Sequence, residues 1–188
     1  MLSDGTDDGI LPEISLENDK IIIFIGNRIV AIQNLEDYQG WENYFEQIKL
    51  VIEKVSNLAG EIKIENISLR YLSRFDSPNS VKEYLRIGKI FEPLSDDPKK
   101  VNLEYTFSEN EITRRINIIQ NGRIRKGSEI LEGFLFGIDI SKNENFPLSD
   151  AQVCLEFIDQ LHSIERDLFR SLLTENFKNQ LFPNPAVE

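Results

Sequence analysis

The chain has 188 residues, of which 40% are hydrophobic and 28% are charged. This length fits one domain, and this composition is too apolar for a disordered chain. Acidic residues outnumber basic ones by 32 to 21, and the net charge of −11 disfavours a general nucleic-acid binder. The longest apolar run, at about 20–25, is far shorter than the ~20 residues that cross a bilayer, so we expect no membrane association.

The single cysteine, Cys154, cannot form an internal disulfide. Because no signal peptide is recognisable either, we expect a cytoplasmic protein. We expect a single α+β domain over residues 10–182, with a disordered N-terminus at 1–9 and a loose tail at 183–188.

The first third of the chain predicts a hairpin and a helix. A strand over about 20–25 leads through a tight turn at Gly26-Asn27 into a second strand over 28–34. From Tyr38 to Leu58, apolar residues recur at helical spacing and predict an amphipathic helix that ends at Gly60.

The middle of the chain alternates between strand and loop patterns. Residues 61–75 predict a strand, and a break in its alternation near Asn66 indicates a β-bulge. A short helix is predicted over 81–87, and two prolines place a loop at 92–100.

The last part predicts strands at about 101–108, 112–120 and 129–140, with Asn121-Gly122 as a turn. A long final helix is predicted over about 149–173, with Ser149 as its N-cap. Its broad apolar stripe is expected at Val153, Phe157, Leu161, Ile164, Leu168 and Leu172, together with Ile158, Phe169 and Leu173. The predicted fold class is therefore α+β, an antiparallel sheet of about six strands with two long helices packed on one face.

Residues that commonly act in catalysis are scarce in this sequence. It has one histidine and one cysteine and no recognisable catalytic, phosphate-binding or metal-binding motif, so we expect no cofactor and no metal. His162 lies at the border of the final helix's apolar stripe, near Asp159 and Glu165. It is either a boundary histidine that hydrogen-bonds a carboxylate or a catalytic or metal-binding group. Cys154 is interpreted as a small packing residue.

Three charged residues lie in apolar strands. Arg70 and Arg74 share one face of what looks like a central strand, and Asp139 interrupts another apolar strand. An ion-pair network across the sheet would satisfy all three. A site for an anion or polar ligand is the alternative.

A further basic cluster surrounds the Asn121-Gly122 turn. It consists of Arg114, Arg115, Arg123, Arg125 and Lys126. It can bind phosphate or an acidic partner, or it can be a solvated hairpin tip that protects a sheet edge.

Four short motifs resemble those of a sporadically distributed, uncharacterised family of bacterial and archaeal proteins. They are Tyr38-Gln-Gly-Trp41-Glu, Leu69-Arg-Tyr-Leu-Ser-Arg74, Gly137-Ile-Asp-Ile140, and Leu161-His162 followed by Phe169 and Leu173-Thr174. The resemblance, which covers about 20–182, is to an LRYxNR strand motif and a C-terminal H…F…LT helix. Ser73 stands where the family usually has Asn, and the family's additional N-terminal portion is missing.

The resemblance implies no enzymatic activity. It makes Arg70, Arg74, Asp139 and His162 candidates for a shared polar site. The family's patchy distribution implies an accessory role in phage defence or a CRISPR-associated system, with a partner protein encoded nearby. If the chain begins inside the fold, an exposed sheet edge would be open to a partner or to a second copy.

Three functions follow as hypotheses. The first is a non-enzymatic protein-binding accessory module. The second is a binder of a small anionic ligand or nucleotide that uses Arg70, Arg74 and the basic turn at 114–126. The third is an enzyme with His162 as general base, which requires His162 in a cleft beside a second polar group.

Overall fold

The structure is a computed structural model, and it describes residues 13–26, 29–35, 38–58, 62–76, 81–86, 100–126 and 129–182. The chain divides into two compact units, Met1–Ala59 and Gly60–Glu188, each of which is described by itself. Whether compact units form one domain depends on whether they unfold cooperatively. The single domain expected over 10–182 therefore stays a prediction. The expected disordered N-terminus, the Gly60 cap and the expected tail lie outside the described residues.

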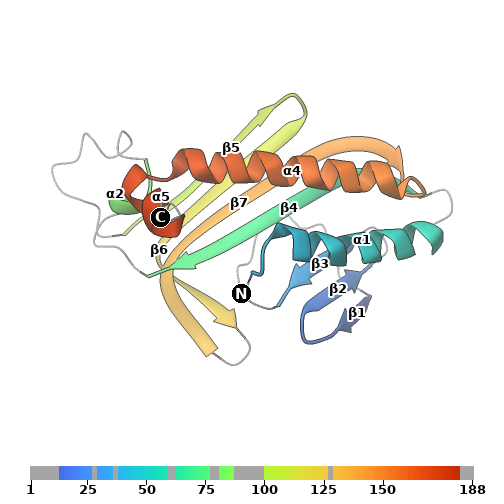
Figure 1. The fold of residues 1–188 in the computed structure, drawn as a ribbon, viewed down its shortest axis with the longest axis horizontal. Helices are drawn as coiled ribbons and strands as arrows, with labels where there is room; N and C mark the ends of the chain where they lie inside the picture. Colours follow the sequence, from blue (N-terminus) through green and yellow to red (C-terminus); the bar gives the residue numbers. More distant parts are fainter. Residues whose placement is uncertain are drawn as a thin grey trace, which may run out of the picture. The chain divides into compact units, whose positions relative to one another are not determined.

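The first unit is a small antiparallel sheet followed by a helix (Figure 1). Its elements are β1 (Ile14–Glu17), β2 (Ile21–Ile25), β3 (Val30–Asn34) and α1 (Trp41–Leu58). The Asn18 side chain accepts hydrogen bonds from the backbone of Lys20 and Ile21, and this forms the turn between β1 and β2. The expected pairing of β2 with β3 is confirmed, whereas β1 was not expected.

Helix α1 has the amphipathic character that its sequence predicts. It begins after Gly40, whose φ of +97° suits glycine, and it buries Ile48, Val51 and Ile52. The Tyr44 hydroxyl donates to the carbonyl of Ile32, which ties the helix to β3.

In the described residues, the second unit is a four-stranded antiparallel sheet with one long helix and two short ones (Figure 1). The strands are β4 (Lys63–Phe75), β5 (Asn102–Glu109), β6 (Ile112–Lys126) and β7 (Glu129–Pro147). The helices are α2 (Val81–Tyr84), α4 (Ala151–Leu172) and α5 (Glu175–Leu181). The strand order is β4-β7-β6-β5, so β4 is an edge strand and not a central one. The prediction of a single sheet of about six strands is wrong, because the described strands form one sheet of three strands and another of four.

Helix α4 lies over β4 and β7 and covers one face of this sheet (Figure 1). The buried side chains of the sheet include Leu69, Phe134, Phe136, Ile138 and Ile140, and those of the helix include Cys154, Leu155, Ile158, Leu161, His162 and Glu165. Of the predicted stripe, Ile158 and Leu161 are buried, whereas Phe157 and Ile164 are only half-buried, so the buried face of α4 is rotated from the prediction. Since α1 belongs to the other unit, the packing of two helices on one face stays a prediction.

The N-cap of α4 also differs from expectation. Asp150, not Ser149, accepts a hydrogen bond from the Val153 backbone, 3.2 Å away. The helix ends at Leu172, and Thr174 caps α5.

Two β-bulges interrupt the sheet, and only one was predicted correctly. The register of β4 against β7 shifts between Ile64 and Asn66, which confirms the first. The predicted turn at Asn121-Gly122 is wrong, because β6 continues through these two residues and shifts its register against β7 there. Asn121 has a φ of 56°, which asparagine tolerates in bulges as well as in turns. The same local signal therefore fits both structures.

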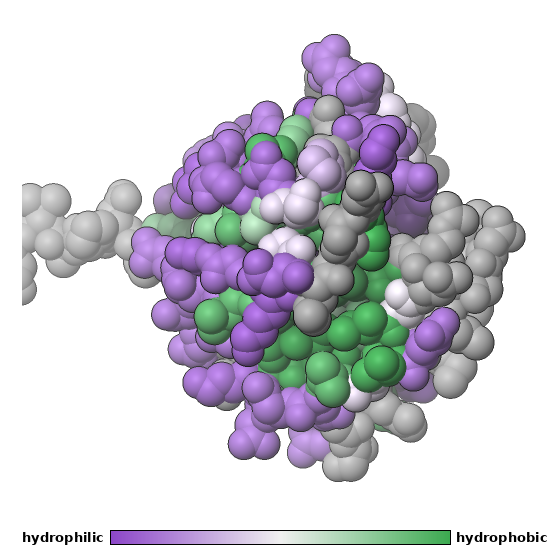
Figure 2. All heavy atoms as spheres, turned by 90° about the vertical axis from the view of Figure 1, so that its right-hand side faces the viewer, coloured by the Kyte–Doolittle hydropathy of each residue, from purple (hydrophilic) through white to green (hydrophobic). Residues whose placement is uncertain are grey.

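Some large apolar side chains reach the surface. Figure 2 shows hydrophobic side chains gathered among hydrophilic ones on the face it displays. Among the described residues at least half exposed are Ile14, Leu16, Leu50, Ile62, Leu72, Tyr105 and Ile130. No helix within the described ranges is long and apolar enough to span a membrane.

Candidate functional site

The face of the four-stranded sheet opposite α4 is polar. Side chains alternate along a strand, so Leu69 and Tyr71 point towards α4 and Arg70 points away from it. The register then aligns Arg70, Asp139 and Arg115 in one row across β4, β7 and β6. The neighbouring row contains Ser68, Ser141, Thr113 and, on β5, Ser108. We call these two rows the polar face.

An ion pair lies at the centre of the polar face. Arg70 donates from Nε and Nη2 to Oδ2 of Asp139, at 3.0 and 2.8 Å, and the Ser68 hydroxyl donates to Oδ1 at 2.8 Å. The predicted Arg70–Asp139 pair is therefore confirmed. The Asp139 side chain is 16% exposed and that of Arg70 is 62% exposed. Arg70 thus neutralises Asp139 while most of its own surface stays available to a partner.

Arg74 does not join this pair, and in this respect the predicted network is wrong. Its Nη1 donates to the carbonyl of Glu132 at 3.1 Å and lies 3.8 Å from Asp76. The reason is distance along the strand, because the four residue steps from Arg70 to Arg74 span about 13 Å. Arg74 consequently lies opposite Leu135 and not opposite Asp139.

A small hollow of about 140 Å³ lies on the polar face. It is lined by Asn66, Ser68, Thr113, Arg115, Asp139 and Ser141. The Nε of Arg115 is shielded from solvent and donates no hydrogen bond. Its carboxylate neighbour is Glu104 Oε1, at 3.8 Å, which is too far for a hydrogen bond. The hollow therefore presents a guanidinium and several hydroxyls beside an aspartate that Arg70 already neutralises.

Sequence reasoning had missed the hydroxyl residues of this hollow. Ser68 lies two residues before Arg70, and Ser141 lies two residues after Asp139. Alternation alone would have placed each on the same face as its charged neighbour. The approach of Thr113 and Arg115 to them depends on the pairing of β6 with β7, which is not a local signal.

His162 lies on the other side of the sheet. Its Nδ1 is 3.2 Å from the Tyr71 hydroxyl and 3.8 Å from Glu165 Oε2, and the residue is buried rather than at a boundary. Tyr71 follows Arg70 on β4, so the two point to opposite faces. The four candidate residues therefore do not form one site.

Burial shifts the pKa values of His162 and of its neighbour Glu165. It lowers the pKa of His162, an effect that Arg166 reinforces and Asp159 opposes. Burial also raises the pKa of Glu165 from 4.5 to about 7, and Arg166 opposes this change. These directions favour a neutral imidazole at neutral pH and a Glu165 carboxyl that loses its proton only near pH 7.

The expected basic cluster is not a single patch in the described part of the chain. Arg114 and Arg115 are adjacent on β6 and point to opposite faces. Arg114 lies over the Phe107 ring and 3.9 Å from Glu109, and Arg123 pairs with Glu132 at 2.7 Å. The predicted cluster around a turn is therefore wrong, because β6 continues through these positions as a strand with a register shift and not as a turn. The side chains of Arg125 and Lys126 lie outside the described residues.

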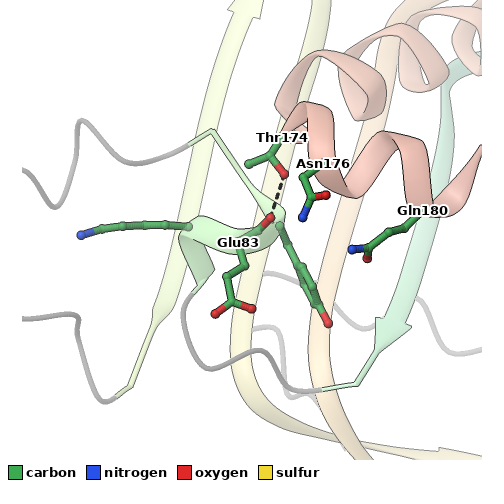
Figure 3. A pocket seen from close by; sticks show the side chains of 6 residues that line it. Glu83, Thr174, Asn176 and Gln180 are labelled. Atoms are coloured by element: carbon green, nitrogen blue, oxygen red, sulfur yellow. Dashed lines mark hydrogen bonds between the residues drawn. The ribbon is translucent and has the colours of Figure 1, made fainter.

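A second hollow, of about 370 Å³, lies where α2 meets α5 (Figure 3). Glu83, Thr174, Asn176 and Gln180 line it with Lys82 and Tyr84. The Thr174 hydroxyl donates to the Glu83 carbonyl at 2.7 Å, the bond drawn in Figure 3, so this donor already has a structural partner. Tyr84 stacks on Phe177, with ring centroids 4.1 Å apart. These contacts join α2 to α5 and do not converge on a ligand.

Cys154 is buried in the core of the second unit. Cys154 is 2% exposed, and burial raises the pKa of its thiol to about 11, which agrees with the expected packing role. Among the described residues, no group of three His, Cys, Asp or Glu side chains can hold a metal ion.

The arrangement that can contact a ligand is therefore the polar face with its hollow. No family model matches the chain, and neither a curated protein nor a solved structure matches it.

Proposed function

We propose that the chain is a non-enzymatic protein-binding module and that the partner docks on the polar face of the four-stranded sheet. The observation that carries this proposal is the Arg70–Asp139 pair, held on an open strand face with Arg70 more than half exposed. Arginine is enriched in protein interfaces because its guanidinium combines charge, planarity and several donors.

The apolar side chain beside this pair supports the same proposal. Leu72 is 51% exposed and lies on β4 between Arg70 and Arg74. An exposed apolar side chain among charged ones is typical of a small interface core with a polar rim. The expected partner is a protein encoded by a neighbouring gene, in line with an accessory role in antiviral defence.

The size of the hollow favours a protein partner over a nucleotide. Small-molecule sites usually enclose ≈ 300–1,000 Å³. The hollow on the polar face has about 140 Å³, which suits a single side chain. The sequence-based alternative, a nucleotide held by Arg70 and Arg74, is also less well supported because both arginines have acceptors within the protein.

An enzymatic role for His162 has less support. A general base must reach its substrate, and His162 is only 9% exposed, on the buried face of α4. It lines neither of the two hollows described above.

The proposal is tested by co-expressing the tagged chain with the products of its neighbouring genes. We expect a complex that survives purification and that Leu72→Glu abolishes. Ile130→Glu is the matched control, because Ile130 is 62% exposed on β7, outside the polar face. Far-UV circular dichroism checks that both variants fold. Failure to recover a complex with any neighbour, or equal effects of the two variants, would count against the proposal.

A further inference from the structure

Strand β5 is an edge of the four-stranded sheet with an open outer side. It is the last strand in the order β4-β7-β6-β5, and no described strand pairs with its outer side (Figure 1). Helix α4 packs on β4 and β7, and β6 separates these strands from β5. The backbone N–H and C=O groups along such an edge are a template for a further strand.

The hydrogen bonds to β6 show which backbone groups of β5 point outwards. The Val101 carbonyl accepts a hydrogen bond from the Gln120 backbone at 2.9 Å, so Val101 faces β6. Because these groups alternate along a strand, the odd-numbered residues of β5 bond to β6. The even-numbered residues, whose N–H and C=O groups point outwards, are Asn102, Glu104, Thr106 and Ser108.

This edge lacks the usual protection of an edge strand. Monomeric proteins protect their sheet edges with lysine, proline, a β-bulge or a very short strand. In β5, Asn102–Glu109 contains neither lysine nor proline, and all eight residues pair with β6 without a register shift. At the other end of the sheet, β4 has a lysine, two arginines and the bulge between Ile64 and Asn66. Of the two edges, β5 is therefore the one suited to pairing.

The side chains of β5 are complementary to those of a second, antiparallel β5. With a two-fold axis at Tyr105, this residue lies opposite its own copy, and Leu103 lies opposite Phe107 on the same face. These are non-hydrogen-bonded pairs, in which side chains approach most closely, while the even-numbered residues exchange about eight backbone hydrogen bonds. Tyr105 is 57% exposed, and its ring centroid lies 5.5 Å from that of Phe107. A second copy would therefore complete an apolar cluster that one copy leaves open.

The charges favour the same register. Glu104 would lie opposite Thr106 of the second copy, and Thr106 is paired with Arg115 on β6. The incoming Glu104 thus lies in the row of Arg115, two strand spacings or about 10 Å away, which the two long side chains can bridge. An axis at Glu104 would place like charges directly opposite each other, which is destabilising. An axis at Thr106 would place Glu109 opposite Leu103, so the axis at Tyr105 gives the best match.

We infer that two copies of the chain associate through β5, whose strands pair antiparallel about a two-fold axis at Tyr105. This pairing joins the two four-stranded sheets into one of eight strands. The axis is perpendicular to the sheet, so the two polar faces lie on the same side. The net charge of −11 on each copy opposes association, and one strand pair buries little surface, so we expect a weak dimer. The inference goes beyond the proposed function and does not rest on it.

Sedimentation velocity of the purified chain, from micromolar to near-millimolar concentration, tests the association. We expect the average mass to rise with concentration from that of the monomer towards that of the dimer. Thr106→Pro should keep the protein monomeric, because the N–H that it removes points outwards and its ring blocks the incoming strand. Thr106→Val, which keeps the N–H, is the matched control and should still form the dimer. Far-UV circular dichroism checks that both variants fold.

Disulfide cross-linking tests the register. Tyr105→Cys should form a covalent dimer on mild oxidation, because the Cα atoms of a non-hydrogen-bonded pair lie about 4.5 Å apart, within reach of a disulfide. Ser108→Cys is the control, since its two copies would lie about 20 Å apart along the paired strands. The natural Cys154 is buried and should not react. Non-reducing electrophoresis distinguishes the covalent dimer from the monomer.

The outcomes separate this inference from the proposed function. A protein that stays monomeric at every concentration would overturn the inference, and so would a dimer that Thr106→Pro leaves intact. Failure of Tyr105→Cys to cross-link, or equal cross-linking of Ser108→Cys, would overturn the register. Leu72→Glu lies on the polar face and should leave the dimer intact; loss of the dimer in this variant would place the interface elsewhere. A dimer without any partner complex would refute the proposed function alone.

Discussion

Glu165 is a buried carboxyl whose ionisation should make the stability of the protein depend on pH. It lies on the buried face of α4 with 6% of its surface exposed, and burial raises its pKa from 4.5 to about 7. His162 faces it at 3.8 Å, and burial lowers the pKa of that imidazole. Near neutral pH the imidazole therefore supplies little positive charge to compensate an ionised Glu165.

The sign and the size of the effect follow from this pKa. The folded state binds the Glu165 proton more tightly than the unfolded state does, so the contribution to stability is complete below pH 4.5 and is lost as the pH rises through 7. With these two pKa values, the free energy of unfolding falls by about 2.5 kcal/mol between pH 5 and pH 8 because of this residue. That is a large part of the ~5–15 kcal/mol that stabilises a typical domain.

The substitution Glu165→Gln keeps the shape of the side chain and removes its ionisation. We therefore expect the variant's free energy of unfolding to exceed the wild-type value by ~2.5 kcal/mol more at pH 8 than at pH 5. Urea unfolding followed by far-UV circular dichroism at both pH values measures this difference. His162 is present in both proteins, so its own titration largely cancels in the comparison.

The matched control is Glu156→Gln, because Glu156 lies on the same helix with its side chain exposed and hydrogen-bonded to Gln152. We expect its effect on the free energy of unfolding to be nearly the same at both pH values. A Glu165→Gln effect that does not change with pH would refute the reasoning. The same pH dependence in both variants would assign it to general charge effects and not to burial.

Three further predictions concern the core and the cooperativity of the fold. Cys154 should resist alkylation at pH 8 in the folded protein and react readily in urea, as mass spectrometry would show; fast reaction of the folded protein would contradict its burial. Gly133→Ala should destabilise by about 2–3 kcal/mol in urea unfolding, since its Cβ would lie 2.4 Å from the Phe75 carbonyl oxygen. Gly137→Ala, with 3.4 Å to its nearest neighbour, is the control and should cost less. Calorimetry should show one transition if 10–182 forms a single domain, and two separate transitions would disprove it.

Much of the secondary structure could be predicted because it depends on local patterns. Helical spacing of apolar residues placed α1 and α4, and the break in alternation near Asn66 marked the register shift between β4 and β7. Alternation also placed Arg70 and Arg74 on one face of β4 and Leu69 and Tyr71 on the other. The pairing of Arg70 with Asp139 was inferred because charges in apolar strands need partners, and the structure confirms it.

Other features depend on which segments meet in space. The division into sheets of three and four strands and the edge position of β4 follow from strand pairing, which a single segment does not encode. Asn121-Gly122 carries a signal that suits a turn and a bulge equally, and only the register of β6 against β7 made it a bulge.

The sequence by itself therefore determined the α+β class, most of the elements and the Arg70–Asp139 ion pair. The tertiary structure decided that His162 lies on the opposite side of the sheet from Asp139 and that Arg74 is out of reach. It also brought Thr113 and Arg115 to the hollow beside Asp139. The physical reason is that alternation and helical spacing are properties of neighbouring residues, whereas the register of paired strands depends on packing over the whole sheet.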